Sequence, residues 1–338
     1  MSDPDSSVYL DNNATTAVAP ECMAAVHLAL ACYGNPSSKH SLGEAAKTLT
    51  MKGRASVASL LGATASEVVF TGSATEANHQ AILGALAMQP EKRHIVTSAV
   101  EHPASLSLLH SLEAKGYQVS YLPVDRQGQL DLTTLAASLS EATALVSLMW
   151  ANNETGVLFP IAEASQIAHA RRVCFHTDAV QAVGRVPIDL SRLPGIGLLS
   201  VSGHKLHAPK GIGALFVRKG LKIPPLLHGH QERERRGGTE NVAGIAACGV
   251  AADLAIQALP LIETRITVLR DRLENELLAR LPGTWINGRH ASRVGTTTSL
   301  SLGSSLEAEW ILDRLDRAGI QASAGAACTA GGTRASHV

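Results

Sequence analysis

Short apolar runs typical of buried strands alternate with helical patterns through most of this chain of 338 residues. The strand-like runs include EVVFTG, HIVTS, QVSYLPV, ALVSLMW and VCFHT. This alternation predicts a mostly parallel sheet with helices on both faces, because right-handed crossovers return each strand to the same direction. In sheets of this kind, ligands bind outside the carboxyl ends of the strands.

Polar side chains follow these predicted strands at the points where the strands end. The residues are Thr75, His102, Asn153, Asp178, Gln181, Ser202, His204 and Lys205. Each one alone is typical of a cap, a turn or a satisfied polar group. Because the carboxyl ends of parallel strands meet at one edge of the sheet, the whole set predicts a ligand site there.

Lys205 stands in the stretch LLSVSGHKLHAPKGIG, which reads as strand, polar turn and strand. Partial burial lowers the pKa of a lysine, so that more of it is the neutral amine that attacks a carbonyl. Taken alone, an exposed lysine in a glycine-rich turn is the competing interpretation.

The turn Gly72–Thr75 joins a strand over 67–70 to a helix that begins near Ala74. The free N–H groups and the positive dipole end of such a helix suit a phosphate, although tight turns also use Gly and Ser for structural reasons. No GK[ST] follows, so a nucleotide P-loop is not supported.

Composition excludes several other classes of protein. Lys+Arg and Asp+Glu are both 29, and no basic stripe indicates nucleic acid. We find no uninterrupted apolar run of membrane-spanning length and no signal peptide, so we expect no membrane partner and a cytoplasmic location. Five cysteines without CxxC spacing read as free thiols.

A lysine, an aspartate, an imidazole and a phosphate turn together match the needs of pyridoxal phosphate. That cofactor takes a lysine as Schiff base and a carboxylate at its ring nitrogen. It also needs a phosphate cradle and a flat side chain to stack on the ring. These roles fall to Lys205, Asp178, the Gly72–Thr75 turn with Ser202 and His204, and His102.

The motifs YLDNNATT, GNPSS, VEHPA, MWANNETG, FHTDAVQAVG, SGHK, GTEN and GAACT…SHV occur in order along the chain. In these it resembles the NifS-type cysteine desulfurases, class V aminotransferase-like enzymes of PLP fold-type I, and most closely their nitrogen-fixation branch. The resemblance implies an α/β fold with a seven-stranded-type, mostly parallel sheet. It also implies a large PLP-binding domain over 16–255, and a smaller α+β domain from 1–15 and 256–338.

The resemblance further implies a role for each matching residue. Lys205 forms the Schiff base and shuttles protons, Asp178 pairs with the ring nitrogen, and Gln181 contacts the phenolic oxygen. His102 stacks on the ring and serves as an acid–base group. The phosphate is held by Ala74, Thr75, Ser202 and His204, joined by Thr239 from the second subunit of a homodimer. Asn153 lies by the cofactor and the substrate carboxylate, with Asn35 a further candidate for the substrate.

Cys328 is the implied nucleophile. Its loop SAGAACTAGGTR has small side chains, which suits a mobile arm. The implied reaction converts L-cysteine to alanine and a Cys328 persulfide, which a NifU-like iron–sulfur scaffold receives for nitrogenase-type cluster assembly. Cys328 would meet metal only transiently, through that persulfide. The other cysteines read as buried hydrophobes.

The sequence also departs from the family pattern. The phosphate turn reads Gly72-Ser73 instead of Ser-Gly, and His228-Gly-His230 stands where glycines are common. Relatives continue beyond SHV and carry an arginine for the substrate carboxylate, so we expect a C-terminally shortened form in which that anchor is missing or supplied differently.

Three other functions stay open at this point. One is a selenocysteine lyase or cysteine sulfinate desulfinase, and another is a PLP-binding remnant without turnover. The third is a metal-dependent hydrolase that uses His176-x-Asp178 or His228-x-His230.

Overall fold

The computed structural model describes residues 7–303, 307–325 and 336–338, so Cys328 lies outside the described residues. The strands are β1 Val8–Tyr9, β2 Val68–Thr71, β3 His94–Ser98, β4 Gln118–Leu122, β5 Thr143–Met149, β6 Cys174–Asp178, β7 Leu198–Ser202, β8 Gly213–Val217, β9 Trp285–Ile286, β10 Leu300–Ser301 and β11 Ile320–Gln321. The α-helices are α1 Pro20–Ala31, α2 Ser41–Leu60, α3 Ala74–Ala87, α4 Pro103–Glu113, α5 Leu132–Ser138, α6 Ile161–Ala170, α7 Gln231–Glu234, α8 Val242–Leu261, α9 Thr267–Arg280 and α10 Ala308–Arg317.

The main sheet has seven strands in the order β2-β8-β7-β6-β5-β3-β4. All of them run in the same direction except β8, which is antiparallel to both β2 and β7. The predicted mostly parallel, seven-stranded sheet is therefore confirmed. Strand β8 runs backward because a turn, not a crossover helix, connects it to β7.

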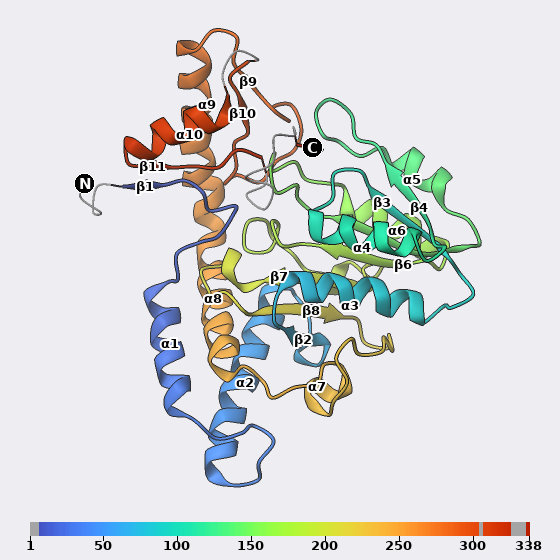
Figure 1. The fold of residues 1–338 in the computed structure, drawn as a ribbon. Helices are drawn as coiled ribbons and strands as arrows, with labels where there is room; N and C mark the ends of the chain where they lie inside the picture. Colours follow the sequence, from blue (N-terminus) through green and yellow to red (C-terminus); the bar gives the residue numbers. More distant parts are fainter. Residues whose placement is uncertain (1–6, 304–306, 326–335) are drawn as a thin grey trace.

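Helices cover the sheet on both faces, as predicted (Figure 1). Alternate residues of each strand point to opposite faces. On β2, Val69 belongs to the hydrophobic cluster that contains residues of α3 and α4, while Val68 and Phe70 belong to the cluster that contains residues of α2, α5, α6 and α8. The strands are therefore apolar on both sides, which explains why their sequences read as nearly continuous hydrophobic runs.

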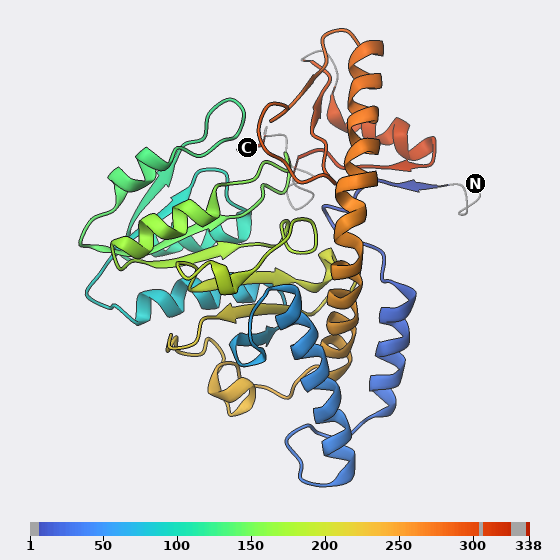
Figure 2. The same ribbon diagram turned by 180° about the vertical axis from the view of Figure 1, so that it is seen from behind.

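Helices α8 and α9 form one long column beside the sheet (Figures 1 and 2). A proline inside a helix is expected to break it, but after Pro260 the chain passes through a π-helical turn, Ile262–Ile266, and stays helical from Val242 to Arg280. That turn takes up the backbone mismatch that a proline inside a helix creates.

The α8–α9 column corrects a second expectation. It is 39 residues long and contains a window with mean hydropathy 1.9, so by length and composition it could cross a membrane. Its first half instead packs into the main hydrophobic core, where Ile245, Cys248 and Ala252 are buried, whereas Leu261 and Val268 further along are exposed. We interpret the first half as a core helix of the protein.

A smaller unit lies at the far end of this column (Figure 1). Its elements follow in the order strand, strand, helix and strand, with β9 paired to β10 and α10 leading into β11. The first strand, β1, joins this unit by pairing with β11 in parallel. The division at residues 16 and 255 stays a prediction.

Candidate active site

The six parallel strands of the main sheet, β2 to β7, end at one edge of the sheet, and β8 begins there. The last residues of β2 and β7, Thr71 and Ser202, both pair with Gly213. Added to Gly213, a Cβ atom would lie 2.6 Å from the backbone carbon of Ser73, so only glycine lets α3 begin this close to the sheet. The N-terminus of α3, with Ala74 and Thr75, is thereby placed beside Ser202.

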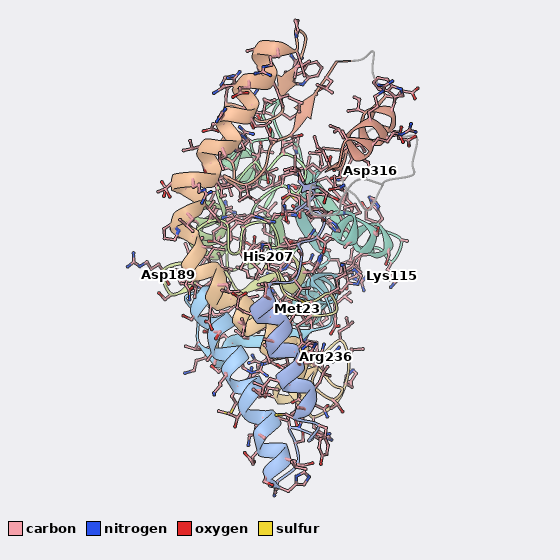
Figure 3. The ribbon with its side chains drawn as sticks, turned by 90° about the vertical axis from the view of Figure 1, so that its left-hand side faces the viewer. Met23, Lys115, Asp189, His207, Arg236 and Asp316 are labelled. Atoms are coloured by element: carbon pink, nitrogen blue, oxygen red, sulfur yellow. The ribbon has the colours of Figure 1, made fainter. Side chains whose placement is uncertain are left out.

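Lys205 follows β7 in the short turn Gly203–Lys205. Its half-buried ammonium donates hydrogen bonds to the carbonyl oxygens of Asn13 and Ala14, the latter at 2.7 Å. Thr16 secures this N-terminal segment, because both its backbone N–H and its hydroxyl donate to the carbonyl of His204 at 3.0 Å. His207 lies in the same loop, and its ring forms a hydrogen bond with the segment just before α1. Met23 lies on that helix (Figure 3).

Asp178 ends β6 with its side chain buried. Its Oδ2 accepts a 2.6 Å hydrogen bond from Nδ2 of Asn78 on α3, and its Oδ1 accepts from the backbone N–H of Val180 at 3.0 Å. Two fixed donors hold a carboxylate in one direction. Such a group suits a protonated ring nitrogen.

His102 caps α4, where its Nδ1 accepts from the backbone N–H of Ala104 at 3.1 Å. Burial lowers the pKa of His102 most strongly, Asp178 opposes that effect, and Lys205 adds to it. The imidazole, the carboxylate and the ammonium thus interact electrostatically, as expected of a shared site. The neutral ring carries its proton on Nε2, because Nδ1 is the acceptor.

His204 stands next to Lys205 with its Nδ1 bonded to the hydroxyl of Thr15 at 3.1 Å. Burial, followed by the charges of Lys205 and Lys210, lowers the pKa of His204 to about 4. Its ring is therefore neutral near pH 7.

Gln181 and Asn153 are linked to the site by hydrogen bonds with Asn13. The Nε2 of Gln181 donates to the carbonyl of Asn13 at 3.0 Å, and Nδ2 of Asn13 donates to the carbonyl of Asn153 at 3.2 Å. Asn13 therefore connects the ends of β5 and β6 to the segment that accepts from Lys205.

These groups fit pyridoxal phosphate in their chemistry. The structure offers an amine, a carboxylate and an imidazole that interact electrostatically, and a helix N-terminus that Gly213 allows to lie beside Ser202. Lys205, Asp178 and His102 would hold the ring, and the first turn of α3 with Ser202 and His204 would hold the phosphate.

Among the described residues of the prediction, Asn35 lies away from this edge. Asn35 caps a local turn through the backbone N–H of Ser37, beyond the far end of α1 from Asn13. Thr239 is exposed and lines a cavity of about 260 Å³ together with Gly72 and Arg236. Cys328 lies outside the described residues.

The sequence interpretation missed several residues at this edge. Asn78 holds Asp178, and Asn13 accepts from Lys205. Glu101 is buried, and burial raises its pKa to about 8. His337 reaches the backbone oxygen of Glu101 at 2.9 Å. The only available signal was that Asn13, Glu101 and His337 stand inside YLDNNATT, VEHPA and SHV.

The histidine of the pair His176-x-Asp178 has no free nitrogen for a metal. Its Nδ1 and Nε2 are bonded to the hydroxyls of Ser147 and Ser200 at 2.8 and 3.0 Å. Among the described residues, no three His, Cys, Asp or Glu side chains are grouped to hold a metal ion.

The comparisons with known proteins agree with this geometry. Residues 8–337 match the model of the aminotransferase class-V family. The chain is 52% identical to cysteine desulfurase 2 of Trichormus variabilis and 49% identical to the cysteine desulfurase NifS of Azotobacter vinelandii, in each case covering 98% of this chain and 83% of the relative. The solved structure of a NifS-like protein superposes with a TM-score of 0.89 at 36% identity, over 94% of this chain and 87% of that one.

A fold and a site of this kind define a class-V aminotransferase. Within that class, the chain belongs to the family of NifS-type cysteine desulfurases.

Proposed function

We propose that this protein is a PLP-dependent cysteine desulfurase that converts L-cysteine to L-alanine and passes the sulfur to Cys328. The single observation that carries the proposal is the meeting of Lys205, Asp178 and His102 at the carboxyl edge of the sheet. The names of the relatives support the same reaction.

Each group would have a defined task. When bound, pyridoxal phosphate supplies an electron sink for bond cleavage next to the substrate nitrogen. Lys205 would carry protons to and from the substrate carbon, and Asp178 would keep the ring nitrogen protonated. His102 would be a second acid–base group.

The sulfur step would belong to Cys328. Its thiolate attacks the substrate sulfur, so that a sulfur–sulfur bond forms while the carbon–sulfur bond breaks. The electron pair of the broken bond goes to the carbon skeleton, which takes up a proton and leaves as alanine. We further propose that the protein acts as a cytoplasmic homodimer, in which Thr239 serves the partner's site, and that a NifU-like scaffold accepts the sulfur.

The test is an incubation of the purified chain with pyridoxal phosphate and L-cysteine, in which alanine and protein-bound persulfide are measured. A yellow chromophore and stoichiometric persulfide in the wild type, with loss of the persulfide but not of the chromophore in Cys328→Ser, would support the proposal. Alanine release that survives Cys328→Ser would indicate a lyase or desulfinase instead. A protein that takes up no cofactor would contradict the enzyme proposal.

A further inference from the structure

Arg185 is a buried cation next to the predicted cofactor site. It is 9% exposed, and burial lowers the pKa of its guanidinium to about 10 with no carboxylate among the described residues to oppose that effect. Burying a cation without a carboxylate partner costs free energy. We therefore look for a role of Arg185 other than stabilising the fold.

The contacts of Arg185 fix the side-chain amide of Gln181. Its Nη1 donates to Oε1 of Gln181 and, at 3.2 Å, to the Gln181 backbone oxygen, while Nη2 reaches the carbonyl of Asn12 at 3.5 Å. A guanidinium can only donate, so the oxygen of the Gln181 amide must face it. The amide nitrogen must then face the other way.

That opposite side is the active-site edge. The Nε2 of Gln181 donates to the carbonyl of Asn13 at 3.0 Å, and the same carbonyl accepts from Lys205. A continuous row of hydrogen bonds thus leads from Arg185 through Gln181 and Asn13 to the lysine.

We propose that Arg185 is a positioning residue that holds the Gln181 amide with its N–H side toward the phenolic oxygen of the cofactor. The proposal rests on the proposed function, because the phenolic oxygen belongs to pyridoxal phosphate. Without the guanidinium, the amide is free to turn over and present its oxygen, which would repel an anionic phenolic oxygen. A donor at that oxygen stabilises its anionic form and weakens its hold on the neighbouring proton.

The first test is a double-mutant cycle on the cofactor-loaded protein, with Gln181→Ala, Arg185→Met and the double variant. The measurement is the pH midpoint of the visible absorption band. We expect each single change to raise the midpoint by about one pH unit, and the double variant to match the single variants, because both remove one interaction. Arg185→Lys, which keeps a donor, should recover most of the shift.

Additive shifts in the double variant, or an unshifted midpoint in Arg185→Met, would overturn the proposal. Arg171→Met on the exposed surface is the matched control and should leave the midpoint unchanged.

A second test needs no cofactor. In the ¹⁵N-glutamine-labelled protein, the side-chain signal of Gln181 is assigned by its absence in Gln181→Ala. We expect Arg185→Met to reduce its protection from hydrogen exchange about tenfold. Unchanged protection in a protein that still binds pyridoxal phosphate would overturn the positioning role alone. A wild-type protein that takes up no pyridoxal phosphate would overturn the proposed function and, with it, the cofactor part of this inference.

Discussion

The side-chain amide of Asn78 donates a 2.6 Å hydrogen bond to the carboxylate of Asp178, although one lies on α3 and the other at the end of β6. Both side chains are buried, at 1% and 7% exposure. The helix that would present its N-terminus to a phosphate therefore also aims the carboxylate that would meet the ring nitrogen, so one rigid element sets both ends of the predicted cofactor site.

Replacing Asn78 by Asp would place two carboxylates against each other in this buried position. Two carboxylates that share a site raise the pKa of one of them and destabilise the fold at high pH. We expect Asn78→Asp to lower the Tm several degrees more at pH 8 than at pH 5, where one carboxyl is protonated. Asn78→Ala loses only the hydrogen bond and should show a loss that is nearly independent of pH. Equal losses of Asn78→Asp at the two pH values would contradict this account.

Replacing Lys205 by Ala should abolish turnover without unfolding the protein. The role proposed for Lys205, to bind the cofactor covalently and to move protons, predicts that this change lowers kcat by about a thousandfold or more. Alanine release measures this effect. Lys210→Ala, at an exposed lysine of the same loop, is the control and should retain activity. Comparable activity in the two variants would remove Lys205 from the mechanism.

The buried imidazole of His176 should make the protein less stable in acid. Burial lowers its pKa to about 3 in the folded state, whereas an exposed histidine titrates near 6.5. The unfolded state therefore binds the proton more readily, so the free energy of unfolding falls as the pH drops from about 6.5 toward 3. Between pH 7.5 and 5.5 this one group should cost about 1.4 kcal/mol.

Denaturant unfolding of wild type and His176→Gln at these two pH values isolates the effect of His176. The variant should lose less stability than the wild type on acidification, because glutamine does not titrate. An equal loss in both proteins would show that other groups govern the acid response.

Arg54 and Glu232 form an ion pair at 2.5 Å with side chains that are 12% and 2% exposed. The Glu232 carboxylate also accepts from the backbone N–H of Phe70, and Glu232 has a left-handed φ of 49°. Arg54→Met leaves a buried, unpaired carboxylate, and we expect a loss of about 3–5 kcal/mol in the free energy of unfolding. Arg54→Met with Glu232→Gln removes that charge and should recover part of it. A double variant as unstable as Arg54→Met would contradict the pairing.

Gly249 on α8 lies against Gly53 on α2, where an added Cβ would be 2.4 Å from the Gly53 Cα. In an ordinary helix, Gly→Ala stabilises by about 1 kcal/mol. Here we expect Gly249→Ala to destabilise by about 1–3 kcal/mol, because the two helices must separate. Chemical unfolding measures the free energy of unfolding of both proteins. A variant that is more stable than the wild type would contradict this account.

The sheet could be predicted from the sequence because its strands are apolar on both faces and helical patterns separate them. Residues such as Asp178 and Lys205 could be placed at its edge because each one follows a strand end. Asn78 could not be linked to Asp178, since one asparagine in a helix carries no mark of a partner in a distant strand. The acceptors of Lys205 could not be predicted either, because they are the backbone carbonyls of Asn13 and Ala14. Every residue has such a carbonyl, so the side-chain sequence does not mark these two. The continuity of the helix past Pro260 depends on a π turn that composition does not reveal.

The pairing of β1 with β11 has a consequence for how the molecule is made. Val8 lies beside Ile320, so β1 leaves the ribosome long before the strand it pairs with. Closing so long a loop is slow and costs entropy. The segment whose carbonyls receive Lys205 follows directly after β1, and it gains this anchor only once β11 has been synthesised. All seven strands of the large sheet are made before β11, so the surroundings of the lysine are completed later in synthesis than the strands that carry the other groups of the site.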